Sequence, residues 1–194
     1  MLLSLGYPGA IVSASAALLI LACSGAAAQS PEQVAGRYFT AMENADWKTC
    51  TELMHPDELA RFKAVFVPLM DSPKGAEGAR ELMGLNSVAE FKKLSDQQVF
   101  EKFLTHMMAK SDMGELMSTM RATVIGSVME GKDTAHVLYR MKMSAYGTDV
   151  EELEVSTLKR YGDSWRLALD KNTEGMAESI RQMVNEDAEP AYTD

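Results

Sequence analysis

The hydrophobic pattern changes its period once, near Arg121, and this change most constrains the fold. Before it, apolar residues recur every three or four positions, as on one side of a helix; after it, they alternate, as on a β-strand. Strands are predicted at 124–129, 134–143, 150–161 and 164–170. Turn signals separate them at 130–133, 146–149 and 162–163. The expected class is α+β, with N-terminal helices packed on one face of a bent, four-stranded antiparallel meander.

Capping signals mark where the helices begin. Ser30 with Gln33, and Ser95 with Gln98, have the spacing of a capping box. Helices are predicted at 31–44, 47–54, 57–67, 95–110 and 113–120. His55 is expected at the end of the second helix, bonding its last carbonyls.

Two segments have weaker helical patterns. The stretch 71–95 contains Pro73 and several glycines, so it is predicted as a loop with one short helix. After the last strand, apolar residues at helical spacing predict a C-terminal helix over 173–185. The acidic residues 186–194 are expected to be disordered. No internal repeat is seen, so residues 29–185 are predicted to form a single α+β domain.

Residues 1–28 contain no charged side chain. Their dense apolar run, 11–22, is shorter than the roughly 20 residues that a membrane-spanning helix needs. A signal peptide is therefore predicted, with export to the periplasm or the extracellular space.

Two ways of leaving the membrane stay open. The small residues before Gln29 suit a signal peptidase that cuts after Ala28 and releases the protein. Ile20–Cys23 instead resembles a lipobox, in which residues 1–22 are removed and Cys23 is acylated. Several acyl chains would then anchor the protein to a membrane as a lipoprotein.

Charge and cysteine content exclude several classes of protein. The chain has 19 basic and 28 acidic residues, which leaves no electrostatic footprint for nucleic acid. After export Cys50 has no partner for an intrachain disulfide, and we expect a buried, structural thiol. No glycine-rich phosphate loop, CxxC pair or catalytic Ser-His-Asp signal is present, so no cofactor is predicted.

The order of elements and several local sequences resemble a known superfamily. The segments Pro31–Val34, Tyr38–Phe39, Ala45–Trp47 and Leu53–Pro56, with the closing hairpin Tyr161–Leu167, carry the likeness. They resemble nuclear transport factor two-like domains, which include ketosteroid isomerase and scytalone dehydratase. The resemblance implies a cystatin-like cone, in which a bent sheet wraps on helices around a cavity, and pairing into a homodimer. Residues 71–120 are longer and more helical than compact members need.

Side chains with chemical potential are few and have ordinary explanations. The resemblance implies a cavity, and we take Tyr38, Trp47, Phe103 and Tyr139 as its candidate ligand contacts. Members that are enzymes keep an acid or base inside it, for which the weak candidates here are His136, Glu154 and His106. His136 and Arg140 share the less apolar side of their strand, with Glu152 and Glu154 on the next strand. Together the four form either a solvated, charge-paired face or a polar pocket.

Methionine is the one residue type in excess, with 15 in the chain. His106, Met107, Met108, Met113, Met117 and Met120 lie close in sequence, and thioethers with an imidazole suit Cu(I). An apolar helix stripe shows the same spacing. We therefore predict no metal site.

These observations favour a non-catalytic binding or assembly domain of the cell envelope or the secreted fraction. It is expected to hold a small apolar ligand or a protein partner, and it meets a membrane only through an anchor at Cys23. The alternative is a cofactor-free lyase or isomerase with an acid or base in the cavity.

Overall fold

Helices occupy the chain up to Thr119 and strands follow them, as the change of period predicts. The computed structural model describes residues 29–110, 113–145, 147–169, Gly175 and Ser179. Within these residues the helices are α1 (Pro31–Glu43), α2 (Trp47–Leu53), α3 (Pro56–Phe66), the 3-10 turn η1 (Pro68–Asp71), α4 (Pro73–Met83), α5 (Val88–Lys93), α6 (Asp96–Lys110) and α7 (Met113–Thr119). The strands are β1 (Arg121–Glu130), β2 (Thr134–Ala145), β3 (Thr148–Tyr161) and β4 (Ser164–Leu167). The α+β class is confirmed.

The two predicted capping boxes form at the starts of α1 and α6. The backbone N–H of Ser30 donates to Gln33 Oε1 at 2.9 Å, and that of Ser95 donates to Gln98 Oε1 at 2.9 Å. The prediction for His55 is wrong, because its ring caps the next helix rather than ending the previous one. Its Nδ1 accepts a hydrogen bond from the backbone N–H of a residue in α3's first turn at 3.3 Å.

Residues 71–95 are mostly helical, so the prediction of a loop with one short helix is wrong. Ser72 caps α4 by accepting a hydrogen bond from the backbone N–H of Gly75 at 3.1 Å, and Pro73 takes the first helical position. Gly84 ends the helix in the left-handed conformation. Each glycine lowers helix stability by only about 1 kcal/mol. Burial of one face of α4 against η1 and α6 offsets that loss.

The strands form one antiparallel sheet in the order β1-β2-β3-β4, which confirms the predicted meander. Gly131, Gly147 and Gly162 in the three turns all have positive φ, a conformation that glycine adopts without strain. The register of β1 against β2 shifts between Val124 and Gly126, which makes a bulge in the edge strand.

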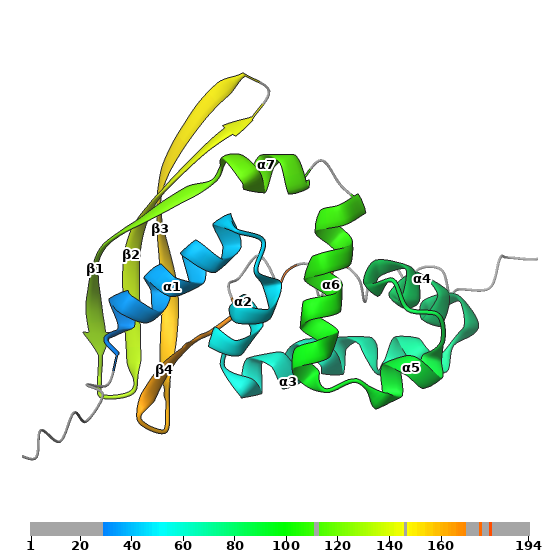
Figure 1. Ribbon diagram of the computed structural model, residues 1–194. Helices are drawn as coiled ribbons and strands as arrows, with labels where there is room; N and C mark the ends of the chain where they lie inside the picture. The colour runs from blue at the N-terminus through cyan, green and yellow to red at the C-terminus, as the bar shows by residue number, and fades with distance from the viewer. Residues whose placement is uncertain (1–28, 111–112, 146, 170–174, 176–178, 180–194) are drawn as a thin grey trace, which may run out of the picture.

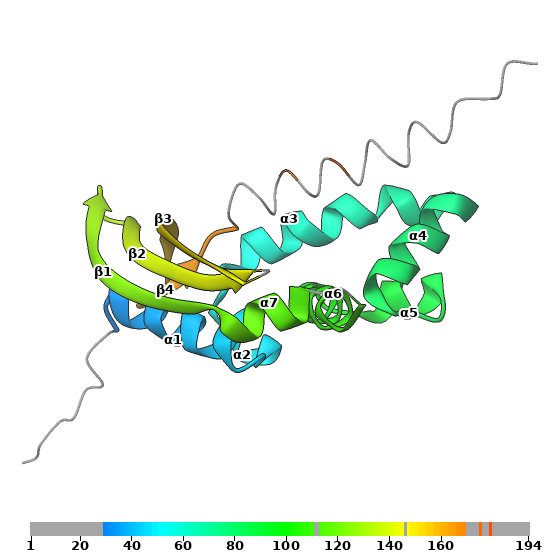
Figure 2. The same cartoon turned by 90° about the horizontal axis from the view of Figure 1, so that it is seen from above.

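The molecule has a sheet end and a helical end (Figure 1). At the sheet end, α1 crosses one face of the sheet, and the strands curve along it (Figure 2). At the helical end, α3, α4, α5 and α6 lie together, away from most of the sheet. We call the sheet face toward α1 the inner face and the opposite one the outer face. Val137 and Leu158 of the inner face are fully buried.

An aromatic cluster holds the helical end together. The ring centroid of Phe62 lies 4.9 Å from that of Phe100, 5.1 Å from that of Phe103 and 5.2 Å from that of Phe66. All four side chains are buried. Such rings contribute through buried area and through edge-to-face contacts, so α3 and α6 form one packed unit.

Carboxylates fix α1 to the edge strand at both ends of the helix. Near its start, Ser127 Oγ of β1 donates a hydrogen bond to Glu32, and this bond lowers the pKa of the Glu32 carboxyl. In its last turn, Glu43 Oε1 accepts a hydrogen bond from the backbone N–H of Ala122 at 2.9 Å. These contacts hold α1 over the inner face.

A buried ion pair joins α3 to the sheet. Glu58 is 2% exposed, and its Oε1 lies 2.8 Å from Lys159 Nζ of β3, while Oε2 pairs with Arg61. Burial is the largest single influence on the pKa of Glu58 and raises it. The hydrogen bonds and charges of Lys159 and Arg61 together outweigh burial and lower the pKa below its ordinary value.

Several predictions fall outside the residues that the structure describes. These are the signal peptide 1–28, acylation at Cys23, most of the C-terminal helix over 173–185, and the acidic tail 186–194. Among the described residues, no helix is long and apolar enough to cross a membrane.

Candidate functional site: a cavity against the sheet

A cavity of about 310 Å³ lies between the inner face of the sheet and helices α1, α6 and α7. We call it the sheet cavity. It is lined by Tyr38, Phe39, Met42, Met54, Phe100, Leu116, Met117, Met120, Ala122, Tyr139, Met141, Met143, Glu154, Val155, Ser156, Leu167, Ala168 and Leu169. Its volume is at the small end of the range for ligand pockets, and a mainly apolar wall with a few polar groups is typical of them.

Secondary-structure periodicity brings the lining side chains together. Tyr38 and Met42 are four residues apart on α1, so they share one side of the helix. Tyr139, Met141 and Met143 are two residues apart on β2, so they share the inner face. The ring centroids of Phe39 and Tyr139 lie 4.3 Å apart, which closes the cavity where α1 meets β2.

Six of the lining residues are methionines: Met42, Met54, Met117, Met120, Met141 and Met143. Methionine is unbranched and polarisable, so a wall of this kind adapts to ligands of different shape. The excess of methionine in the sequence is thus partly explained by the walls of one cavity.

Glu154 is the one ionisable side chain, apart from the tyrosines, among the described residues that line the sheet cavity. It lies directly opposite Tyr139 in the β2–β3 ladder, and Ser156 follows two residues later on the same face. Glu154 is partly buried and forms no hydrogen bond or ion pair with another described residue. The wall therefore contains a carboxylate that no described residue neutralises.

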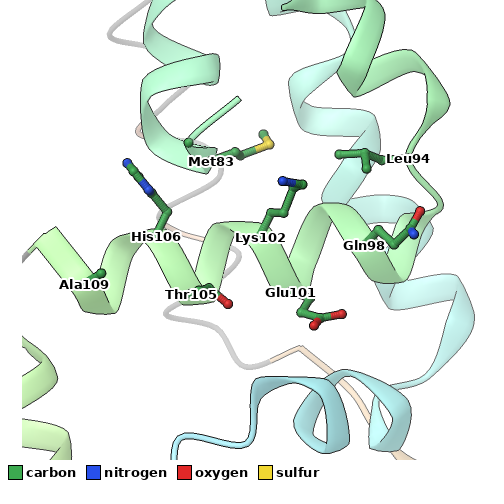
Figure 3. A pocket seen from close by; sticks show the side chains of 9 residues that line it. Met83, Leu94, Gln98, Glu101, Lys102, Thr105, His106 and Ala109 are labelled. Carbon is green, nitrogen blue, oxygen red and sulfur yellow. The ribbon is translucent and has the colours of Figure 1, made fainter. Parts of the chain in front are cut away.

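A second hollow lies at the helical end. This helical groove, of about 490 Å³, is lined by Met83, Gly84, Leu94, Gln98, Glu101, Lys102, Thr105, His106 and Ala109. Figure 3 shows His106 and Lys102 pointing from α6 toward Met83, whereas Glu101 and Thr105 point to the other side of the helix. Lys102 Nζ lies 3.3 Å from Glu90 Oε1, so its charge is already paired.

Only two of the four predicted ligand contacts line the sheet cavity. Tyr38 and Tyr139 line the sheet cavity, as predicted. Phe103 does not, because it is 1% exposed inside the aromatic cluster. Trp47 is partly buried on α2 and lines neither hollow. The sequence shows where the large aromatic side chains are, but it does not show which of them line a cavity and which are packed in the core.

The three weak acid–base candidates lie in different places, and the predicted grouping of four polar residues is wrong. His106 lines the helical groove, and Glu154 lines the sheet cavity. His136 is on the outer face, where Nε2 is 2.7 Å from Glu130 Oε2 and Nδ1 is 3.1 Å from Thr157 Oγ1.

The β2–β3 register explains the error. It sets Glu152 opposite Met141, on the inner face, whereas Arg140 lies on the outer face and pairs with Glu151. His136 and Arg140 therefore lie on a solvated face where their charges are paired, which is the first of the two arrangements considered for them.

The cavity methionines were missed as site residues, although a signal for them was present. The alternation that predicts β2 already sets Met141 and Met143 on the same side as Tyr139. The sequence groups Met117 and Met120 with His106, either as copper ligands or as an apolar helix stripe. In the structure they line the sheet cavity whereas His106 lines the helical groove.

No candidate metal or nucleophile centre emerges from the described residues. No group of three or more His, Cys, Asp and Glu side chains among them is placed to hold a metal ion. Cys50 is fully buried, and burial followed by the charge of Asp46 raises the pKa of its thiol to about 12. A thiol in this state is a poor nucleophile.

Comparisons with protein families, curated proteins and solved structures found no match to this chain.

Proposed function

We propose that the protein is a non-catalytic binding domain that holds a small apolar ligand in the sheet cavity. The observation that carries the proposal is the wall of that cavity, in which methionine, leucine and aromatic side chains surround about 310 Å³. The resemblance to nuclear transport factor two-like domains, with a cone-shaped fold around a cavity, agrees with this use. Export, with release after Ala28 or anchoring at Cys23, is part of the proposal.

A pair of matched substitutions tests the site. Ala122 lines the sheet cavity and Ala109 lines the helical groove, so Ala122→Phe fills one hollow and Ala109→Phe fills the other. The neutral fluorescent probe N-phenyl-1-naphthylamine is titrated into the wild type and both variants. We expect binding to be lost in Ala122→Phe and kept in Ala109→Phe. Absence of binding to the wild type, or loss in Ala109→Phe alone, would reject the proposal.

One observation favours the alternative, a cofactor-free lyase or isomerase. Glu154 is a carboxylate on an otherwise largely apolar wall, a setting in which a general base can act on a bound carbon acid. The test is deuterium incorporation from D₂O into a bound ketone such as 2-nonanone, followed by NMR. Exchange that depends on the protein and is lost in Glu154→Gln would establish catalysis; an uncatalysed rate would favour binding alone.

A homodimer through the outer face stays a prediction of the resemblance. That face exposes Val128, Leu153 and Val155, which are 70%, 58% and 56% accessible. Sedimentation equilibrium of the wild type and of Leu153→Lys tests it, since a lysine in the paired face would shift a dimer toward monomer.

A further inference from the structure

The polar part of the sheet-cavity wall has a single sign of charge. Glu154 supplies a carboxylate, and Tyr38, Tyr139 and Ser156 supply hydroxyl groups. No lysine, arginine or histidine is among the described lining residues. An anionic ligand would therefore meet a like charge that no cation among the described lining residues offsets, and burying an unpaired charge is strongly unfavourable.

The carboxylate is also placed to meet the head of a ligand. Glu154 and Tyr139 are cross-strand partners, so their side chains leave adjacent points of the inner face. The methionines of β2 extend along the same face, from Met141 to Met143. A ligand with a polar head at Glu154 would thus place an apolar body along the methionine wall.

We propose that the ligand is a cationic amphiphile, an apolar chain or ring system with an ammonium group that pairs with Glu154. This inference rests on the proposed function of the sheet cavity and names its ligand class. A charge-assisted hydrogen bond is about twice as strong as a neutral one. Tyr38 and Tyr139 also line the cavity, and tyrosine rings attract a cation that lies over them. A net charge of −9 draws cations toward the protein and repels anions.

The test compares three ligands that differ only in the head group. Octylamine, 1-octanol and octanoate are titrated at pH 7 into the wild type, Glu154→Gln and Glu152→Gln, with calorimetric detection. Glu152→Gln is the matched control, because Glu152 lies on the same strand and face but is exposed and does not line the cavity. We expect octylamine to bind the wild type about tenfold more tightly than octanol, with octanoate weakest.

The variants locate the effect. Glu154→Gln is expected to lower the affinity for octylamine about tenfold and to change the affinity for octanol by less than about twofold. Glu152→Gln is expected to behave as the wild type. Equal losses in both variants, or octanoate binding the wild type as tightly as octylamine, would overturn the cationic ligand and leave the proposed function intact. Absence of binding by all three ligands would overturn both. If Glu154→Gln does not fold, the affinities of the wild type for the three ligands decide the question.

Discussion

The sheet cavity and the helical groove are both hollows in this protein, but they differ in how their polar groups are used. In the helical groove, Lys102 is paired with Glu90 and the lining is rich in polar side chains. In the sheet cavity, apolar side chains dominate and Glu154 has no partner among the described residues. The cavity leaves an apolar wall and a charge that a ligand would satisfy.

The same contrast separates two buried or partly buried glutamates. Glu58 is almost fully buried, and Lys159 and Arg61 neutralise it, so it stabilises the joint between α3 and the sheet. Glu154 faces a cavity, and no residue that the structure describes neutralises it. Glu58 has its partners within the fold, whereas Glu154 has none among the described residues and is open to a ligand in the cavity.

The largest predicted effect concerns Phe103, which sequence placed in the ligand site. Phe103→Ala removes a buried ring from the aromatic cluster and should lower the free energy of unfolding by about 3–5 kcal/mol. Urea denaturation measures it, with the exposed Thr105→Ala as control, expected within about 0.5 kcal/mol. A small loss of stability together with lost ligand binding would instead show that Phe103 belongs to the ligand site.

The second prediction compares the two glutamates. Glu58→Gln weakens hydrogen bonds to two cations and should lower the free energy of unfolding by about 1.5–3 kcal/mol at pH 7. Glu154→Gln should change it by less than about 0.5 kcal/mol. If both substitutions reduce stability equally, Glu154 has a structural partner and the contrast fails.

The pH dependence sharpens this second prediction. The folded-state pKa of Glu58 is lowered from 4.5. Its contribution is therefore fully present above pH 4.5 and is lost as the pH falls through the folded-state pKa. The stability difference between wild type and Glu58→Gln should narrow with acidification, as urea denaturation over a pH series will show. A difference that widens below pH 4.5 would contradict this assignment.

A smaller effect is expected at the helical groove. In Gly84→Ala the new Cβ meets a left-handed backbone with φ of 62° and lies 2.6 Å from His106 Nδ1. We expect a loss of about 1–2 kcal/mol in the free energy of unfolding. In Gly78→Ala, inside α4, the new Cβ has no atom within 4 Å, and the substitution should instead raise the free energy of unfolding by about 0.4–1 kcal/mol.

This substitution also separates the two hollows. Because Gly84 lines the helical groove and not the sheet cavity, Gly84→Ala should leave the binding of N-phenyl-1-naphthylamine unchanged. A weakened interaction with the probe would show that the groove contributes to the site.

Local signals in the sequence were sufficient for most of the fold. The change of period near Arg121, the three turns and the capping boxes at Ser30 and Ser95 all have their predicted structures. The helical stretch 71–95 was missed because burial against α6 outweighs the low helix propensity of its glycines. That burial is a tertiary contact, which no local pattern contains.

The position of Glu154 could not be predicted, for a related reason. The sequence predicts that polar residues share the polar face of the sheet. The register between two strands is set by the turn that joins them, and the turn at Gly147 places Glu154 opposite Tyr139. A charged residue on an inner face breaks the usual pattern of a sheet, and such exceptions concentrate at functional sites.

Methyl NMR of the methionines tests the central claim most directly. Met42, Met117, Met120, Met141 and Met143 line the sheet cavity, Met83 lines the helical groove, and Met70 is in the core. On titration with octylamine, we expect the methyl signals of the cavity methionines to shift in parallel until the protein is saturated with ligand. The signals of Met83 and Met70 should not move. Shifts at Met83 with the cavity signals unmoved would contradict the assignment of the site.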